Sequence, residues 1–75
     1  MPRLPIVSGT KAVKAFQRLG FIVDRQRGSH VVMKKVTAEG ERGCVIPMHK
    51  EVAVGTLRSA LKMAGVSPEE FNEVL

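Results

Sequence analysis

Residues 21–46 read FIVDRQRGSHVVMKKVTAEGERGCVI, and this stretch decides the fold. Its β-branched and aromatic runs predict three strands: one beginning at residues 21–23, one over residues 30–36, and a short one over residues 44–46 that Pro47 ends. The polar residues 25–29 predict a turn, and residues 37–43, with two glycines, predict a loop. Three short strands with short connections favour an antiparallel sheet.

Helices are predicted on both sides of this stretch. Residues 8–19 carry apolar side chains at helical spacing, with Ser8 as N-cap and Gly20 as the C-terminal stop. A second helix is predicted from residue 55 to 64, and Ser-Pro-Glu-Glu at residues 67–70 is a strong start for a short third. The order predicts an α+β sandwich, α-β-β-β-α plus a terminal helical turn, with helices on one face of a three-stranded antiparallel sheet.

Alternation along the second predicted strand assigns side chains to the two faces of the sheet. We expect Val31 and Met33 to point toward the helices. His30 and Lys34 then share the opposite face, which the two helices leave open to solvent or to a ligand.

Length and cysteine content restrict the class of protein. The chain has 75 residues, 44% of them hydrophobic, which predicts one small domain over residues 1–75. Cys44 is the only cysteine, so no internal disulfide can form, and with His30 and His49 it supplies too few ligands for a zinc site. No run approaches the roughly 18 apolar residues of a membrane span, and residues 1–5 lack the apolar core of a signal peptide. We expect a cytoplasmic protein with no metal, no cofactor and no membrane association. With disulfides and zinc set aside, a partner protein remains one way in which so small a chain could be stabilised.

The charge distribution indicates a polyanionic ligand. Residues 1–64 contain all twelve Lys and Arg and four of the seven acidic residues, a net charge of +8, whereas residues 65–75 carry three Glu and a net charge of −3. A basic body is typical of proteins that bind nucleic acid. Tyr and Trp are absent, so stacking of bases on an aromatic platform is not expected. Recognition of duplex or structured RNA by shape and charge fits better.

His30 is the first candidate for chemistry, because histidine can accept and donate protons near neutral pH. Gly28 and Ser29 precede it and allow close approach of the backbone to a ligand, and Arg25 and Arg27 could hold a phosphate. A base beside such cations is what cleavage of RNA by its own 2′-hydroxyl requires. From the residues alone, however, the simpler interpretation is a histidine at a strand edge, in solvent or hydrogen-bonded to a turn carbonyl.

Three further residues are candidates for contact with RNA. His49 could act as a second acid or base or bind phosphate; a structural hydrogen bond across its loop is the alternative. Lys34 and Lys50 could contact backbone phosphates, or they could belong to a solvated basic face. Cys44 has apolar strand neighbours and is predicted to be a core residue rather than a nucleophile.

A series of short motifs runs in order from Leu4 to Phe71 and resembles one protein family. The motifs are Leu4-Pro5, Ser8-Gly9, Val13-Lys14, Leu19-Gly20-Phe21, Arg25-Gln26-Arg27-Gly28-Ser29-His30, Val45-Ile46-Pro47-Met48-His49-Lys50-Glu51, Gly55-Thr56-Leu57-Arg58, Ala64-Gly65-Val66-Ser67 and Glu69-Glu70-Phe71. Together they resemble the HicA mRNA interferase toxins of HicA–HicB toxin–antitoxin pairs, also called YcfA-like. Neither the Gly-Ser-His run nor the Gly-Thr-Leu-Arg run would be specific alone.

The resemblance implies a double-stranded-RNA-binding-like fold, which agrees with the predicted order of elements. It implies that the histidine of the Gly-Ser-His motif, His30 here, is catalytic in cleaving mRNA. It also implies a HicB-type antitoxin that covers the basic surface and blocks the active site, and no direct contact with DNA except through that antitoxin. The leading hypothesis is therefore the toxin of a type II toxin–antitoxin system, a metal-independent endoribonuclease.

Two other hypotheses remain open at this stage. A non-catalytic protein that binds double-stranded RNA would share the fold and the charge. A DNA-binding helix-turn-helix formed by the last two helices is disfavoured, because its recognition helix would carry Glu69, Glu70 and Glu73 and no basic residue.

Overall fold

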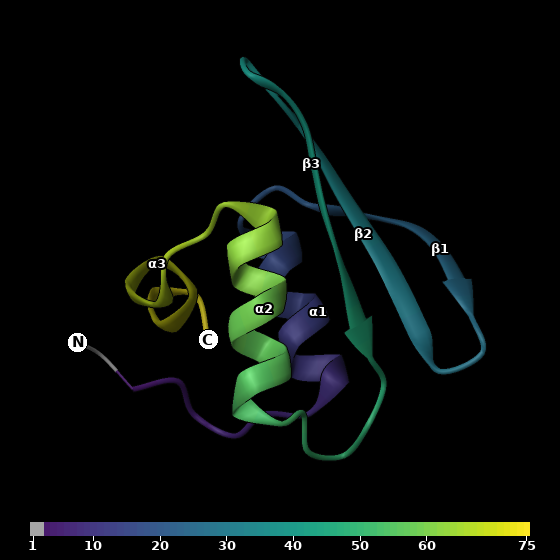
Figure 1. The fold of residues 1–75 in the computed structure, drawn as a ribbon, viewed down its shortest axis with the longest axis vertical. Helices are drawn as coiled ribbons and strands as arrows, with labels where there is room; N and C mark the ends of the chain where they lie inside the picture. Colours follow the sequence, from purple (N-terminus) through teal and green to yellow (C-terminus); the bar gives the residue numbers. More distant parts are fainter. Residues whose placement is uncertain (1–2) are drawn as a thin grey trace.

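The computed structural model describes residues 3–75, and residues 1–2 of the predicted domain lie outside that range. The order of elements is the predicted one, with α1 and α2 covering one face of the sheet (Figure 1). The predicted α+β class and α-β-β-β-α layout are confirmed. The elements are α1 (Gly9–Arg18), β1 (Ile22–Arg27), β2 (His30–Thr37), β3 (Gly40–Pro47), α2 (Val54–Ala64) and α3 (Pro68–Glu73).

The strands pair antiparallel in the order β1-β2-β3, but both connections are shorter than predicted. Arg27 opposes His30, so only two residues form the first turn, and β3 begins at Gly40 rather than at Cys44. The predictions of a turn over residues 25–29 and a loop over residues 37–43 were wrong at these boundaries. Polar and glycine residues have low strand propensity, but pairing along β2 supplies ladder hydrogen bonds that override it. At position 43 glycine is favoured, because a Cβ there would lie only 3.0 Å from the carbonyl oxygen of Met33.

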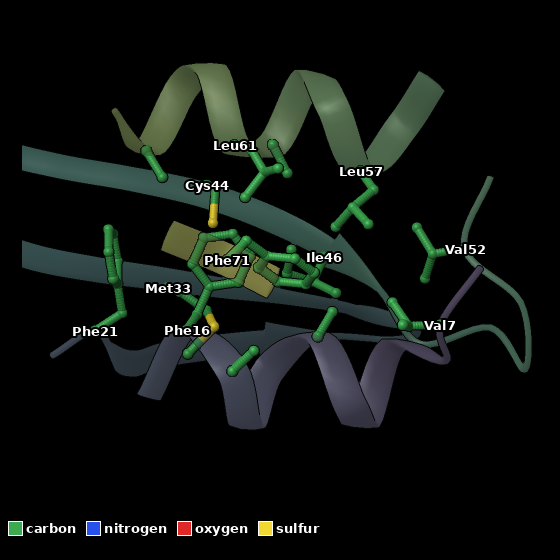
Figure 2. Packing of buried hydrophobic residues seen from close by; sticks show 14 of the residues in the cluster. Val7, Phe16, Phe21, Met33, Cys44, Ile46, Val52, Leu57, Leu61 and Phe71 are labelled. Carbon is green, nitrogen blue, oxygen red and sulfur yellow. The ribbon is translucent and has the colours of Figure 1, made fainter. Parts of the chain in front are cut away.

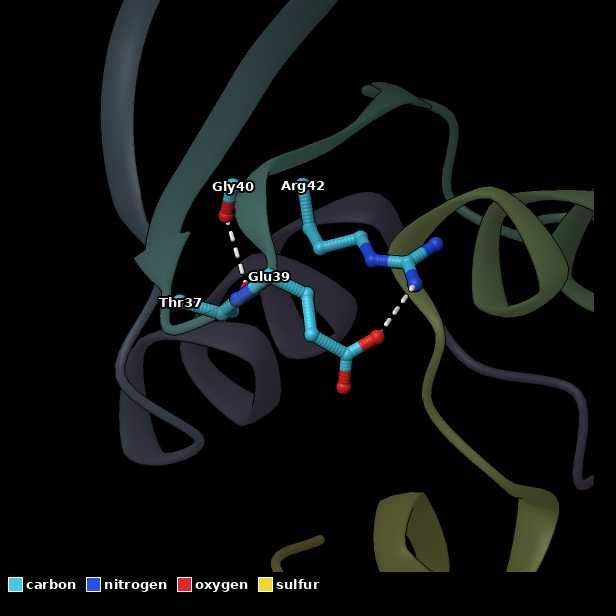
Figure 3. A network of polar contacts seen from close by, with 4 residues as sticks. All are labelled: Thr37, Glu39, Gly40 and Arg42. Atoms are coloured by element: carbon cyan, nitrogen blue, oxygen red, sulfur yellow. Dashed lines mark hydrogen bonds and ion pairs between the residues drawn. The ribbon is translucent and has the colours of Figure 1, made fainter.

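The β2–β3 turn is held by its own polar side chains (Figure 3). The hydroxyl of Thr37 donates to the carbonyl of Gly40 at 2.7 Å and accepts from the backbone N–H of Glu39 at 3.2 Å. The Glu39 carboxylate lies 4.0 Å from the guanidinium of Arg42. The hydrogen bonds of Thr37 support a two-residue turn. The paired ends of β2 and β3 project beyond the helices (Figure 1).

A hydrophobic core fills the space between the helices and the sheet (Figure 2). The ring of Phe16 in α1 packs 5.3 Å from Phe21 and 5.6 Å from Phe71, centroid to centroid, which attaches α3 to the core. Val31 and Met33 are 3% and 0% exposed, so the predicted inward face of β2 is confirmed. Burial of such side chains stabilises the fold by about 1.5–3 kcal/mol each.

The helix ends largely follow the sequence signals. The Ser8 hydroxyl accepts from the N–H of Lys11 at 3.1 Å, and Ser67 and Glu70 form the predicted capping box at the start of α3. Gly20 and Gly65 both have positive φ, as predicted for residues that end α1 and α2. α2 begins one residue earlier than predicted, and no side chain of the described residues caps it. No helix within residues 3–75 is long and apolar enough to cross a membrane.

Candidate functional site

The site is built around the turn between β1 and β2. Gly28 has φ of 56° and no atom of the described residues lies within 4 Å of a Cβ placed on it, so backbone conformation rather than lack of space favours glycine here. The side-chain amide of Gln26 donates to the carbonyl of Gly28 at 3.0 Å and stiffens the turn. His30 follows as the first residue of β2 and is exposed. Within residues 3–75 its imidazole makes no hydrogen bond, so of the two forms of the simpler interpretation the structure fits a histidine in solvent and not one bonded to a turn carbonyl.

A β-bulge determines which face the arginines of β1 occupy. Val23 pairs with Met33 on the inward face, and the next pair is Arg25 with Val32, so Asp24 is an extra residue. The extra residue shifts the alternation by one. Arg25 and Arg27 therefore oppose Val32 and His30 and share the open face with them, instead of sharing the inward face with Val23.

The loop after β3 lies against this turn. Pro47 opposes His30 in the sheet, and the N–H of Met48 donates to the carbonyl of Ser29 at 2.6 Å. The next carbonyl, that of His49, accepts from the N–H of Gly9 at 2.9 Å, which joins the loop to the start of α1. A Cβ on Gly9 would overlap the carbonyl oxygen of Pro47 and lie 2.7 Å from Met48 Cα. The structure thus brings the β1–β2 turn, the loop and the first turn of α1 together.

The same end of the molecule is electropositive. α1 and α2 both begin there (Figure 1), and neither has an acidic residue in its first turn. The N-terminus of a helix carries a partial positive charge. Arg25, Arg27 and Lys50 add full charges on exposed side chains, with Glu51 as the acidic residue of the loop. Exposed His30 and His49 place two imidazoles at this end. The positive charge there favours an anion such as phosphate.

Lys34 differs from the other predicted RNA contacts in its surroundings. Its ammonium lies 3.7 Å from the carboxylate of Asp24 and 3.5 Å from that of Glu41. It is four residues from His30 along β2, which is about 13 Å in a strand. Lys34 shares the open face with His30, as predicted. The structure does not bring it to the β1–β2 turn, and two carboxylates already oppose its charge.

Cys44 is 2% exposed on the inward face of β3, and burial raises the pKa of its thiol to about 11. A thiol with that pKa stays protonated near neutral pH and is a poor nucleophile. The prediction of a core cysteine is confirmed. Among residues 3–75, no group of three or more His, Cys, Asp or Glu side chains is placed to hold a metal ion.

Sequence reasoning missed two residues that shape this site. Gly9 allows α1 to approach the His49 loop, and its signal was a glycine directly after the helix N-cap. Asp24 is the bulged residue that turns both arginines outward. Its signal was an aspartate directly after the β-branched run of residues 21–23, in a stretch that continues as a strand although Asp is depleted in strands.

One protein family matches this chain. The family described as HicA toxin of bacterial toxin–antitoxin matches residues 9–66, which run from the start of α1 to just beyond α2 and include each of the predicted site residues. No curated protein matches the chain.

Proposed function

The chain belongs to the HicA toxin family, and from that premise we propose that it is an endoribonuclease that cleaves mRNA in the cytoplasm without a metal ion. Membership makes it a toxin with a cognate antitoxin as partner. One observation carries the nuclease proposal: the exposed imidazole of His30 lies on the same face of the sheet as Arg25 and Arg27. Arg27 pairs directly with His30 across the β1–β2 turn. The whole chain acts as one domain in this proposal.

In the proposed reaction, His30 removes the proton from a ribose 2′-hydroxyl. The 2′-oxygen attacks the adjacent phosphorus, the bond from phosphorus to the 5′-oxygen breaks, and the products are a 2′,3′-cyclic phosphate and a 5′-hydroxyl. General base catalysis of this kind contributes about 10²–10⁴-fold. The 5′-oxygen takes up a proton as it leaves, from His49, a lysine or water. His49 is the histidine in the loop that hydrogen-bonds to the β1–β2 turn.

The cations supply electrostatic stabilisation. Negative charge on the phosphate oxygens increases as the 2′-oxygen attacks, and fixed positive groups stabilise that charge. Arg25 and Arg27 hold the phosphate in this proposal because the bulge turns both onto the face of His30. The small residues Gly28 and Ser29 let the RNA strand approach the protein backbone closely beside the arginines. Lys50 contacts a flanking phosphate of the RNA. Lys34, opposed by Asp24 and Glu41, contributes least.

The test is incubation of purified protein with RNA in excess EDTA. We expect cleavage by the wild type that yields cyclic phosphate ends, and a rate at least about 10²-fold lower for His30→Ala. His49→Ala is the second variant, because it removes the other exposed imidazole from this end of the molecule. A loss of rate in His49→Ala would assign the proton transfer to the 5′-oxygen to His49, and an unchanged rate would assign it to a lysine or water. If His30→Ala cleaves as fast as the wild type, His30 is not the base.

The same experiment tests the second hypothesis. A protein that binds double-stranded RNA without cleaving it would show binding with steep salt dependence and no cyclic phosphate product. Induced expression of such a protein would also cause no growth arrest that His30→Ala relieves. Loss of cleavage in EDTA with recovery on adding a divalent cation would contradict the metal-independent mechanism.

A HicB-type antitoxin is the proposed partner. A protein that covers Arg25, Arg27 and His30 would exclude RNA from them, and its acidic groups would meet their charge. Direct binding to DNA is not proposed for this chain, because α3 carries Glu69, Glu70 and Glu73 and buries its Phe71 in the core.

A further inference from the structure

The open face of the sheet has two halves with different chemistry. The half next to the β1–β2 turn carries Arg25, Arg27 and His30. The half toward the β2–β3 turn, which we call the apolar half, consists of Ile22, Asp24, Lys34, Val36, Glu41, Gly43 and Val45. Ile22 is 65% exposed and Val36 is 80% exposed. Exposed aliphatic side chains gathered on one side of a sheet are typical of a surface that a partner covers.

The apolar half has a shape that suits the side chains of a protein. Gly43 opposes Lys34 and leaves space beside it. A hollow of about 300 Å³ extends from there past Val45 to the edge of β3, where Arg42 and Met63 of α2 also line it. A second hollow of about 400 Å³ lies on the other side of Lys34, between Ile22 and Val36. The ion pair of Lys34 and Glu41 forms the ridge that separates them.

The apolar half offers less free positive charge to RNA than the other half. The ammonium of Lys34 pairs with the carboxylates of Asp24 and Glu41. Two further cations line the hollows: Lys35, whose ammonium donates to the carbonyl of Leu19, and Arg42, which lies 4.0 Å from Glu39. Arg25 and Arg27 make no ion pair within residues 3–75, so a phosphate backbone is attracted more strongly to the other half. A protein partner can place apolar side chains in both hollows and leave the charged groups at their rim.

We infer that the apolar half is where the cognate antitoxin is anchored. The apolar half and the half that carries Arg25, Arg27 and His30 belong to one small surface. β2 has eight residues, so the open face measures only about 26 Å along the strands and about 14 Å across them. A stable partner covers about 800 Å² on each side. An antitoxin anchored on Ile22 and Val36 therefore extends over Arg25, Arg27 and His30, so inhibition follows from the size of the face.

Anchoring and catalysis then use different residues and can be separated. The double variant Ile22→Thr/Val36→Thr keeps β-branched side chains in both strands but removes apolar surface from the anchor. Both positions are exposed, so the fold and RNA cleavage stay within about twofold of the wild type. Affinity for the antitoxin falls about tenfold or more, because each residue is a central apolar contact. In cells, this variant arrests growth even when the antitoxin is present.

The probe is the purified product of the reading frame adjacent to this one, and its affinity is measured without RNA. Ile6→Thr is the matched control, because Ile6 is also 65% exposed but lies outside the sheet. Unchanged affinity in the double variant, an equal loss with Ile6→Thr, or no binding by the wild type overturns the inference. Self-association of the wild type that the double variant abolishes would make a second copy the occupant and also overturn it.

The inference rests on the proposed function only for its inhibitory consequence. Absence of RNA cleavage by the wild type would contradict the nuclease proposal. The binding measurement would still decide where the antitoxin is anchored.

Discussion

Replacing Gly9 by alanine tests the contact that joins α1 to the candidate site. The new Cβ overlaps the carbonyl oxygen of Pro47 and lies 2.7 Å from Met48 Cα. Both are backbone atoms of a loop that is hydrogen-bonded to Gly9 through His49 and to the β1–β2 turn through Ser29. The loop therefore cannot yield as the end of a flexible side chain would, and either α1 or the loop has to move.

The expected cost has two parts. Overpacking against a fixed neighbour costs about 1–3 kcal/mol, and loss of the hydrogen bond from Gly9 to His49 costs about 0.5–1.5 kcal/mol. We expect the free energy of unfolding to fall by about 2–3 kcal/mol. In a chain of this length, each kcal/mol shifts Tm by about 4–8 °C, so Tm falls by roughly 10–20 °C.

The matched control is Gly55→Ala, since Gly55 also lies in the first turn of a helix. No atom of the described residues is within 4 Å of a Cβ placed there. Alanine should therefore stabilise the protein by about 0.4–1 kcal/mol, through the lower entropy of the unfolded chain. Thermal and urea unfolding monitored by circular dichroism measure both changes. If Gly9→Ala and Gly55→Ala shift Tm in the same direction, the argument from close approach at Gly9 is wrong.

Two further predictions concern RNA binding and pH. Arg27→Gln should make the slope of log affinity against log salt shallower by about 0.7–0.9, the effect of one lost phosphate contact. Lys34→Gln should change the slope less, because Asp24 and Glu41 already oppose that charge. Equal changes of slope for the two variants in filter-binding titrations would contradict the assignment of Arg27 as a phosphate contact. Burial raises the pKa of the Cys44 thiol from 9.0 to about 11, so the unfolded chain releases this proton first as pH rises. Between pH 9 and 11 the free energy of unfolding should therefore fall by about 2 kcal/mol more than in Cys44→Ala, which chemical unfolding at a series of pH values would detect.

Local signals in the sequence were sufficient to predict the fold. The N-cap at Ser8, the stop at Gly20 and the capping box at Ser67 act within four residues, so they hold without knowledge of the rest of the chain. Alternation in β2 correctly assigned Val31 and Met33 to the core. The lengths of β1 and β3 were underestimated because their polar and glycine residues are stabilised by pairing with β2, which no local propensity reports.

The sequence by itself determined the order of elements, the inward face of β2 and the candidate histidine in a Gly-Ser-His turn. Only the tertiary structure decided which cations surround that turn. The bulge at Asp24 brings Arg25 and Arg27 to the face of His30, and the two carboxylates beside Lys34 set that lysine apart. The physical reason is that these relations depend on register and on charges seven to ten residues away along the chain. Such residues become neighbours only when the strands pair.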